Sequence, residues 1–300
     1  MKICAVMVTY NPDSPLEQNI RALLPQVDQL IVVDNGSEPR IRADIAALAS
    51  ACNFEVIWNN KNLGLATALN QGIHRGLARD DYAWIATFDH DSQVPGGFCD
   101  AMIKAYLSCP YRERVGLIGP YHTMFPEDNA ASRLHGEPAP LFREIHIVMQ
   151  SGCFLSAGAL RSIGLFDESF FIDYVDIDFC LRLRKNGLRL IEAANAVIVH
   201  RLGDPSKHTI LGKTTTVYSH SPVRRYYATR NRLRMYSRYL LSDPLWIGHD
   251  ARCWLREMVK LLLFEQDRCR KLGYIARGAW DAFRGRNGMY SEGNIPSSVQ

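Results

Sequence analysis

The sequence lacks the features that mark several classes of protein. None of its eight cysteines belongs to a Cys-x-x-Cys pair, and several lie in apolar segments, as buried free thiols do. We therefore expect neither a zinc site nor a disulfide framework, and this cysteine usage favours a reducing cytosol. No stretch approaches the roughly 18 apolar residues that span a bilayer. The first apolar run ends at Thr9, which is too short for the core and cleavage site of a secretory leader.

The composition is that of a globular protein with a sizeable core. Of the 300 residues, 47% are hydrophobic and 22% are charged, which allows one large domain or one domain with an appendage. The formal net charge is +4, but the charge is unevenly distributed. Residues 224–286 hold 15 Lys and Arg against 6 Asp and Glu, so the rest of the chain is net acidic.

Apolar strands alternate with helices over the first third of the chain. The predicted strands are residues 3–8, 29–33, 54–58 and 82–88, and the helices between them are residues 16–24, 40–52 and 65–77. This alternation is typical of βαβ units and a mostly parallel sheet. Later strands are predicted at 115–119, 145–149 and 190–199, a helix at 176–187, loops at 122–140 and 204–221, helices from 222 onward, and disorder in the last dozen residues.

Polar clusters follow three of these strands at the point where each strand ends. They are residues 9–11, 34–37 and 89–91. In open α/β sheets, ligands bind beyond the carboxyl ends of the strands. We therefore expect the three clusters to form one composite site.

Asp89 and Asp91 flank His90 directly after the predicted strand 82–88. Two carboxylates so placed suit a hard divalent cation, which prefers oxygen ligands and keeps sites for substrate phosphates. A metal held in this way predicts a nucleotide diphosphate ligand. The alternative is a simple strand-end turn, in which Asp and Ser are common. His200 follows another strand and could complete the coordination, since Mn²⁺ accepts imidazole, although a lone histidine there is more often structural.

A second acidic cluster surrounds the start of the helix predicted near residue 176. Asp176 lies at the helix N-terminus, where the helix dipole keeps a carboxylate ionised, as a general base must be. Simple helix capping, a role that aspartate fills well, is the commoner explanation of an aspartate there. Asp178 and Arg182 are four residues apart and can pair on the helix surface.

The order of these motifs resembles that of glycosyltransferase family 2, whose members are inverting enzymes of GT-A fold. The resemblance covers about residues 3–240, and several motifs in the right order are far more specific than any single one. The segments that carry it are 6–12 (VMVTYNP), 31–37 (IVVDNGS), 62–72 (NLGLATALNQG), 88–92 (FDHDS) and 166–182 (FDESFFIDYVDIDFCLR). The segments 171–178, 200–203 (HRLG) and 225–231 (RYYATRN) are most similar to bacterial dTDP-rhamnosyltransferases.

This resemblance implies a fold and a role for individual residues. The fold is α/β, a Rossmann-like, mixed but mostly parallel GT-A sheet flanked by helices over residues 1–205, followed by a loop and a basic helical region over 206–300. The implied general base is Asp176. The implied nucleotide-binding residues are Thr9, Tyr10, Asn11, Asp34, Asn62 and Asp89; the metal ligands are Asp91, Asp89 and His200; the residues at the acceptor or donor sugar are Ser151, Gly152 and Asp173; and the diphosphate contact is Arg230. Many members of this family have Glu-Asp where this chain has Val175-Asp176. The role of that glutamate is therefore either not filled in this chain or filled by Asp173.

The implied activity is the transfer of L-rhamnose from dTDP-L-rhamnose to a hydroxyl of a glycan or lipid-linked glycan. The implied process is the synthesis of bacterial cell-surface polysaccharide such as O-antigen. The implied cofactor is Mg²⁺ or Mn²⁺. One alternative is a transferase of the same fold that uses a UDP-sugar; another is a non-catalytic nucleotide-binding module, which gives no reason for the second acidic cluster. A nucleotidyltransferase should carry a Gly-rich, basic loop after the first strand, and residues 9–13 are not one. No nucleic-acid motif accompanies the basic C-terminal region.

The C-terminal region interleaves basic and apolar side chains. The basic set is Arg252, Arg256, Lys260, Arg268, Arg270 and Lys271, and the apolar set is Trp254, Leu255, Val259, Leu261, Leu262 and Leu263. Basic amphipathic helices of this type lie on anionic lipid. The alternatives are a solvated helical cap and a helix–helix or homo-oligomer interface. We expect a cytoplasmic protein, at the inner face of the cell membrane if the lipid interpretation holds.

Overall fold

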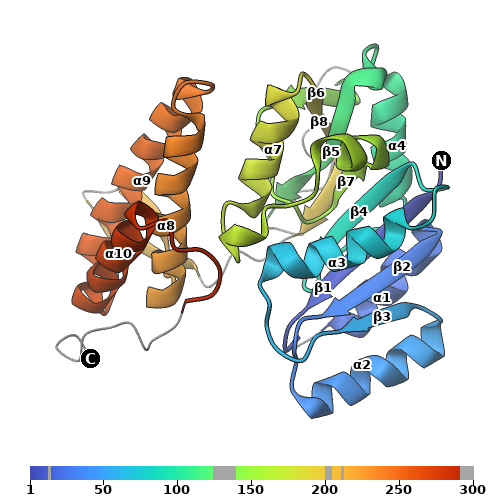
Figure 1. Ribbon diagram of the computed structural model, residues 1–300, viewed down its shortest axis with the longest axis horizontal. Coiled ribbons are helices and arrows are strands. Elements are labelled where there is room, and N and C mark those ends of the chain that lie inside the picture. Colours follow the sequence, from blue (N-terminus) through green and yellow to red (C-terminus); the bar gives the residue numbers. More distant parts are fainter. Residues whose placement is uncertain (13–14, 124–139, 200–204, 211–212, 291–300) are drawn as a thin grey trace. The chain divides into compact units, whose positions relative to one another are not determined.

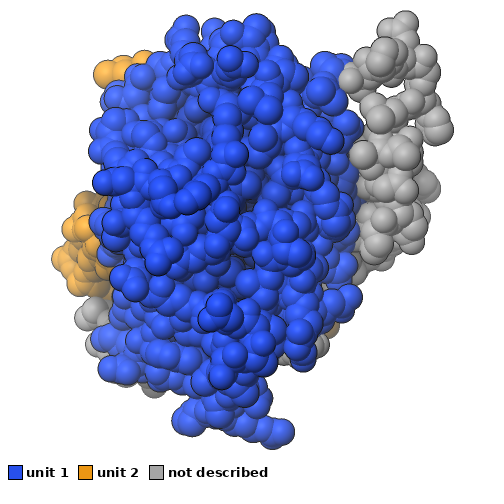
Figure 2. Space-filling model, turned by 90° about the vertical axis from the view of Figure 1, so that its right-hand side faces the viewer, with its two compact units in different colours: residues 1–168, 175–201 blue, residues 169–174, 202–300 orange. Residues whose placement is uncertain are grey.

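A computed structural model describes residues 1–12, 15–123, 140–199, 205–210 and 213–290 (Figure 1). Contacts between Cα atoms divide the chain into two compact units, coloured separately in Figure 2. Unit 1 comprises Met1–Glu168 and Val175–Arg201, and unit 2 comprises Ser169–Tyr174 and Leu202–Gln300. The short segment 169–174 thus belongs with the C-terminal part of the chain, which no pattern in the sequence indicated.

Unit 1 is built on an eight-stranded mixed sheet with the strand order β3-β2-β1-β4-β7-β5-β8-β6. Its strands are β1 (Ile3–Thr9), β2 (Gln29–Asp34), β3 (Glu55–Trp58), β4 (Trp84–Asp89), β5 (Val115–Thr123), β6 (Phe142–Ile145), β7 (Cys153–Ser156) and β8 (Arg189–Val199). Strands β1 to β4 pair in parallel, as the βαβ pattern predicts. Strand β7 pairs antiparallel to both β4 and β5, which makes the sheet mixed.

Helices flank this sheet (Figure 1). The helices of unit 1 are α1 (Leu16–Leu23), α2 (Pro39–Cys52), α3 (Leu65–Leu77), α4 (Phe98–Ser108), α6 (Ala157–Ile163) and α7 (Val175–Lys185). Helix α3 packs on β1 and β2, and α4 packs on β5 and β8. The α3 approach is close because Gly72 has no side chain: a Cβ there would lie 2.3 Å from Val6 Cγ1. Met7, Phe88 and Phe154 are fully buried in the core beneath these helices.

Two predictions for the middle of the chain are wrong. The strand expected at 145–149 does not form; the strands nearest to it are β6 and β7. Val148 instead packs its side chain against Gly119, where a Cβ would lie 2.7 Å from Val148 Cγ2. The loop expected at 204–221 contains an antiparallel pair, β9 (Pro205–Ile210) and β10 (Lys213–Tyr218). The hairpin was not predicted because the segment is polar. The run Thr214-Thr215-Thr216-Val217-Tyr218 is nevertheless rich in residues that favour strands.

The helices predicted from residue 222 onward are present in unit 2. They are α8 (Pro222–Tyr239), α9 (Pro244–Phe264) and α10 (Arg268–Phe283). Helices α8 and α10 pack closely because Gly278 allows it: a Cβ there would lie 2.5 Å from the Tyr226 carbonyl oxygen. Of the helices that the structure describes, none has both the length and the hydropathy needed to cross a bilayer. Most of the loop expected at 122–140, and the tail 291–300, lie outside the described residues.

Candidate active site

The three polar clusters that follow β1, β2 and β4 meet at one edge of the sheet. In the strand register, Thr9 of β1 lies opposite Asp34 of β2, and Val8 lies opposite Asp89 of β4. Strand β1 lies between β2 and β4. It therefore brings the end of β2, at Asp34, and the end of β4, at Asp89, to the same edge of the sheet. The composite edge expected from the pattern of strand ends is formed by these residues.

Asp34 is fully buried at this edge and bonded to the loops on both sides. Its Oδ1 accepts a hydrogen bond from Thr9 Oγ1 at 3.2 Å, and its Oδ2 accepts one from the Ser37 amide at 3.1 Å. Arg42 Nε lies 3.8 Å from Oδ2. Each carboxylate oxygen has two lone pairs, so an acceptor position remains on each. The role of Asp34 at the nucleotide base stays a prediction.

Asn11 continues the same network on the loop after β1. Its amide donates to Ser37 Oγ at 2.9 Å, and its Oδ1 accepts from the Glu38 amide at 2.9 Å. Its backbone is left-handed, with φ of 43°. Tyr10 beside it is 46% exposed, so its ring is accessible at the edge of the site.

Asn35 connects the β2 end to the segment before α3. Its Nδ2 donates to Asn62 Oδ1 at 3.0 Å and to the Gly64 carbonyl at 3.2 Å. Its Oδ1 accepts from Asn59 Nδ2 at 3.1 Å and from the Leu63 amide at 3.0 Å. Asn62, predicted at the nucleotide, thus shapes the wall of the site through Asn35, for which no separate role was predicted.

The next residue, Gly36, is required by a close approach of two loops. Its φ is +88°, and a Cβ there would lie 2.5 Å from the backbone carbon of Lys61. A side chain at this position would therefore collide with backbone and adopt an unfavourable conformation. Glycine allows the Asp34 loop and the Asn62 loop to pack together.

Asp89 at the end of β4 is held by the segment 150–152. Its amide donates to Ser151 Oγ at 3.0 Å, and Gln150 Nε2 donates to its Oδ1 at 2.5 Å. Ser151 Oγ is also 2.6 Å from Ser92 Oγ. The Gly152 amide donates to the Thr87 carbonyl at 2.7 Å, with φ of +80° at the glycine. The structure thus brings Ser151 and Gly152, predicted near the sugars, next to the Asp89 motif.

Burial, together with two nearby carboxylates, makes it harder for Asp89 to ionise. Burial is the main cause and the negative charge of Asp91 the second, and together they raise the pKa of Asp89 to about 7. His90 and the hydrogen bond from Gln150 act in the opposite direction, and Asp176 adds a further increase. Asp176 of the second acidic cluster is thus close enough to Asp89 for its negative charge to act on that carboxyl group.

Asp176 lies in the first turn of α7, as predicted, and its Oδ1 accepts a hydrogen bond from the Ile177 amide at 2.8 Å. This hydrogen bond fits both interpretations of Asp176, as a helix cap and as an ionised general base. Asp178 pairs with Arg182 Nε at 2.8 Å, as the four-residue spacing predicts. The pair is not on the surface, however, because the Asp178 side chain is fully buried.

Three predicted site residues belong to unit 2 or lie outside the described residues. Asp173 belongs to unit 2, where Arg224 Nη2 lies 3.3 Å from its Oδ1. Arg230 also belongs to unit 2 and is fully buried; its guanidinium donates to the Gly288, Ser169 and Phe170 carbonyls and to Asn231 Oδ1. These bonds give Arg230 a structural role, and its diphosphate role stays a prediction. His200 lies outside the described residues.

Two features of the site were not predicted from the sequence: Gln150, and the anchor of the segment 166–168. Asn70 of α3 donates to the Phe166 carbonyl and to Glu168 Oε1, both at 2.9 Å, and accepts from the Phe166 amide at 3.0 Å. These hydrogen bonds fasten the segment 166–168 to α3. In the described part of the chain, no three His, Cys, Asp or Glu side chains gather as a ready metal cluster.

Comparison with known proteins identifies the fold and the family. A model of glycosyl transferase family 2 matches residues 4–154, more than half of the chain. The chain belongs to glycosyl transferase family 2. It is therefore a glycosyltransferase, and its mixed sheet with flanking helices is the GT-A fold.

Curated relatives of this glycosyltransferase match most of its length. The dTDP-rhamnosyl transferase RfbF of Shigella flexneri is 29% identical over 244 residues, which cover 76% of this chain and 78% of that protein. The galactofuranosyltransferase GlfT1 of Mycobacterium tuberculosis is 27% identical over 277 residues, which cover 85% of this chain and 86% of that protein.

A solved structure supports the fold alone. GalNAc-T7 with UDP, GalNAc and Mn²⁺ superposes with a TM-score of 0.56 at 11% identity. The match covers 79% of this chain and 47% of that one, so this chain spans about half of that larger protein.

Proposed function

We propose that this glycosyltransferase transfers L-rhamnose from dTDP-L-rhamnose, with inversion, to a hydroxyl of a glycan or lipid-linked glycan acceptor. The observation that carries the proposal is the position of Asp89 at the carboxyl end of β4, where burial and then the negative charges of Asp91 and Asp176 raise its pKa. One acidic group beside the leaving diphosphate and one beside the acceptor hydroxyl are what an inverting displacement needs. The choice of rhamnose is supported by the likeness to the Shigella flexneri enzyme.

The donor set at Asp89 fits a hard divalent cation. Burial and the charge of Asp91 together oppose ionisation of Asp89, a repulsion that a bound cation would relieve. Gln150 Oε1 is buried and has no hydrogen-bond partner in the described part of the chain, although its Nε2 is bonded to Asp89. Carboxylate and amide oxygens are the ligands that Mg²⁺ and Mn²⁺ prefer. We assign Asp91 and Asp89 as the metal-holding residues, with His200 as a further candidate, and the ion's chemistry there would be to neutralise charge on the leaving diphosphate.

The proposed reaction is a single in-line displacement. The acceptor oxygen forms a bond to the anomeric carbon while the bond from that carbon to the diphosphate oxygen breaks. Asp176 takes the proton of the acceptor hydroxyl, and dTDP leaves with the bonding electron pair. The N-terminal end of α7 keeps Asp176 ionised before the reaction, because its partial positive charge favours the carboxylate.

The nucleotide would bind along the loops after β1 and β2. Thr9, Tyr10, Asn11, Asp34 and Asn62 are proposed to line this part of the site. Arg42 lies with its guanidinium carbon 5.0 Å from the centroid of the Trp58 ring, and Trp58 is 37% exposed. An exposed, cation-supported ring beside the buried Asp34 suits the stacking of a pyrimidine base.

A membrane surface is the proposed location of the acceptor, with the protein in the cytoplasm. Helix α9 exposes five apolar side chains: Leu245 (86%), Leu255 (65%), Leu263 (56%), Val259 (48%) and Leu262 (48%). Arg252 and Arg256 are exposed among them. The two acidic residues of α9, Asp250 and Glu257, are paired with Arg232 and Lys260. The exposed face is thus apolar and cationic, which suits anionic lipid; a homo-oligomer interface is the alternative.

The second candidate is a transferase of the same fold that uses a UDP-sugar. The observation in its favour is the likeness to a galactofuranosyltransferase over a larger share of the chain. Membership of the transferase family disfavours the non-catalytic nucleotide-binding module. The two transferase candidates differ only in the donor.

A donor screen separates these candidates. Purified full-length protein would be incubated with Mg²⁺ or Mn²⁺, short glycan acceptors and either dTDP-L-rhamnose or UDP-sugars, and the product linkage read by NMR. We expect transfer from dTDP-L-rhamnose and a product of inverted anomeric configuration. Transfer from a UDP-sugar alone would overturn the donor assignment, and retained configuration would overturn the mechanism.

A further inference from the structure

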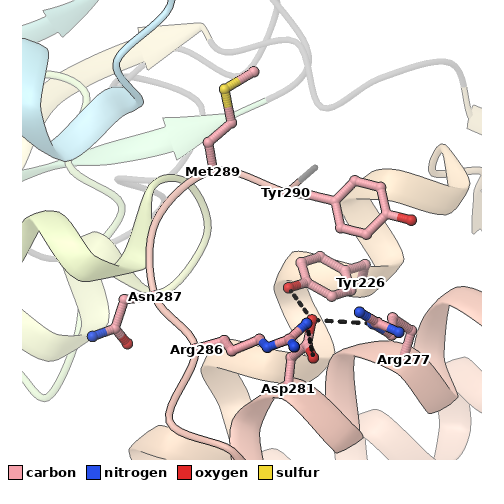
Figure 3. A pocket seen from close by; sticks show the side chains of 7 residues that line it. All are labelled: Tyr226, Arg277, Asp281, Arg286, Asn287, Met289 and Tyr290. Atoms are coloured by element: carbon pink, nitrogen blue, oxygen red, sulfur yellow. Dashed lines mark hydrogen bonds and ion pairs between the residues drawn. The ribbon is translucent and has the colours of Figure 1, made fainter. Parts of the chain in front are cut away.

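Unit 2 contains a pocket that the proposed catalytic chemistry does not use. Its cavity volume is about 240 Å³. The lining side chains come from α8, from α10 and from the segment after α10: Tyr226, Arg277, Asp281, Arg286, Asn287, Met289 and Tyr290. We call it the unit 2 pocket. In Figure 3, Arg277 and Arg286 approach Asp281 from either side, and Asn287 and Met289 point away from this cluster.

Asp281 is the centre of the pocket and is only 3% exposed. Its Oδ2 accepts hydrogen bonds from Tyr226 Oη at 2.9 Å and from Arg277 Nε at 3.2 Å. Its Oδ1 lies 3.4 Å from Arg286 Nη1 but has no hydrogen-bond donor among the described residues. A buried acceptor left without a donor costs about 1–3 kcal/mol. This oxygen is therefore a position at which a ligand hydroxyl would be stabilised.

The two arginines supply the complementary donors. Arg277 donates one hydrogen bond to Asp281, from its Nε. Arg286 forms an ion pair with Asp281. The other guanidinium N–H groups of both arginines make no hydrogen bond to any residue that the structure describes. A guanidinium has five N–H donors in a fixed plane. Several oriented donors therefore surround one unsatisfied acceptor in the same small cavity.

Aromatic rings complete the wall of the pocket. The Tyr226 and Tyr290 ring centroids are 4.6 Å apart. The Tyr226 ring lies on α8 close to α10 because Gly278 lets the two helices approach. Aromatic side chains present an apolar surface together with a polar end, which suits ligands that are apolar on one face and polar at the rim.

A purely structural explanation leaves part of this cluster unaccounted for. The segment after α10 is already fixed by its backbone: the Arg286 amide donates to the Asp281 carbonyl at 2.9 Å, and the Tyr290 amide donates to Tyr227 Oη at 2.6 Å. Arg230 Nη1 further binds the Gly288 carbonyl at 2.7 Å. The Arg286 side chain is therefore not needed to hold the segment in place.

We infer that the unit 2 pocket binds one sugar residue of the glycan acceptor, other than the residue that is being extended. Sugar hydroxyls both donate and accept, which matches Asp281 Oδ1 and the arginine N–H groups, and the C–H face of a sugar ring packs on tyrosine. The cavity is below the roughly 300–1,000 Å³ of pockets for drug-sized ligands, so it suits a single sugar ring rather than a nucleotide. A free phosphate is disfavoured because it would face the Asp281 carboxylate. The inference rests on the proposed function, since it takes the substrate to be a glycan.

Binding of methyl glycosides to the full-length protein tests the inference directly. Saturation-transfer difference NMR would be recorded with the methyl glycosides of L-rhamnose, N-acetylglucosamine and galactose, with dTDP present to occupy the nucleotide site. We expect at least one glycoside to bind, and Arg286→Gln, alone and combined with Arg277→Gln, to weaken it by about tenfold, the equivalent of 1.4 kcal/mol. The matched control is Arg284→Gln, because this exposed guanidinium lies 5.0 Å from the Trp280 ring centroid, outside the pocket.

Transfer kinetics supply a readout that a merely structural role would not give. The Arg286→Gln variant should show a raised KM for an acceptor of several sugars, with kcat and the KM for a monosaccharide acceptor unchanged. Transfer without any glycoside binding, or binding equal in all variants, would overturn this inference alone. The protein could also bind a glycoside, lose this binding in Arg286→Gln, and yet transfer no sugar. That result would contradict the proposed function and leave the pocket as a sugar-binding site.

Discussion

Asn231 holds Asp173 in a left-handed backbone conformation. Asn231 Nδ2 donates to the Asp173 carbonyl at 2.9 Å and also to the Phe170 and Ile172 carbonyls. Asp173 has φ of 60°, and Phe171 and Tyr174 have φ of 62° and 67°. Each such non-glycine residue costs about 1–2 kcal/mol, and strain of this kind persists where surrounding bonds impose it, often at functional sites. The role of Asp173 at a substrate stays a prediction.

Replacing Asp173 with glycine should separate strain from function. The Asp173→Gly change relieves the left-handed strain but loses the Arg224 pair and raises the entropy of the unfolded chain, so we expect the free energy of unfolding to stay within about 1 kcal/mol. If Asp173 contacts a sugar, the transfer rate should fall by about tenfold or more, as expected for the loss of a hydrogen bond to a charged group. Urea unfolding and initial rates measure both. Asn53→Gly is the matched control, because Asn53 is also left-handed, with φ of 56°, and ends α2. Full activity in Asp173→Gly would refute the sugar contact.

The strands that position the site could be predicted because their signals are local. Strands β1, β2 and β4 are apolar runs that end in polar clusters, so sequence reasoning found both the edge of the sheet and Asp89 there. Gln150 was missed because it is 61 residues from Asp89. Only the antiparallel insertion of β7 between β4 and β5 brings segment 150–152 to the site, and no local pattern encodes that pairing. The hairpin β9–β10 was missed because its polar residues gave no apolar alternation.

The raised pKa of Asp89 predicts how the metal-free protein responds to pH. In the folded state Asp89 stays protonated up to about pH 7, whereas in the unfolded chain it ionises near its ordinary value of 3.8. Between these values the folded state binds more protons, so the contribution of Asp89 to the free energy of unfolding falls as the pH rises from about 4 to about 7. Urea unfolding in the presence of a chelator, across this range, measures the effect.

Comparison with the Asp89→Asn variant isolates this contribution. The difference in unfolding free energy between the wild type and Asp89→Asn should change with pH in that window and flatten when Mg²⁺ or Mn²⁺ is added, because a cation favours the ionised pair. Asp100→Asn, at an exposed position in α4, is the control and should leave the pH dependence of the wild type in place. A difference that does not vary with pH would show that Asp89 titrates normally.

The exposed face of α9 predicts binding to anionic vesicles. Each arginine near an anionic surface contributes about 1 kcal/mol, so Arg252→Gln combined with Arg256→Gln should lower the partition constant roughly 30-fold. Flotation with vesicles of phosphatidylglycerol and phosphatidylcholine, against phosphatidylcholine alone, measures it. Leu255→Ser should also weaken binding, whereas Leu107→Ser, at a 48% exposed leucine in α4, should not. Flotation that is unchanged by the α9 variants would leave the homo-oligomer interface as the explanation, which the sedimentation coefficient of the same variants would reveal.

Asp176→Asn tests the assignment of the general base. Asparagine keeps an oxygen that can accept the Ile177 amide, so the start of α7 should remain intact, but it cannot take a proton. Loss of a general base reduces turnover by about 10²–10⁴-fold. We expect kcat to fall in this range while the dissociation constant of the nucleotide sugar, measured by calorimetry, changes little. Asp100→Asn is again the matched control, because Asp100 is likewise the acid in the first turn of its helix. If Asp176→Asn binds the donor and transfers at near the wild-type rate, capping is the sole role of Asp176 and the base must be sought among the other carboxylates, Asp173 first.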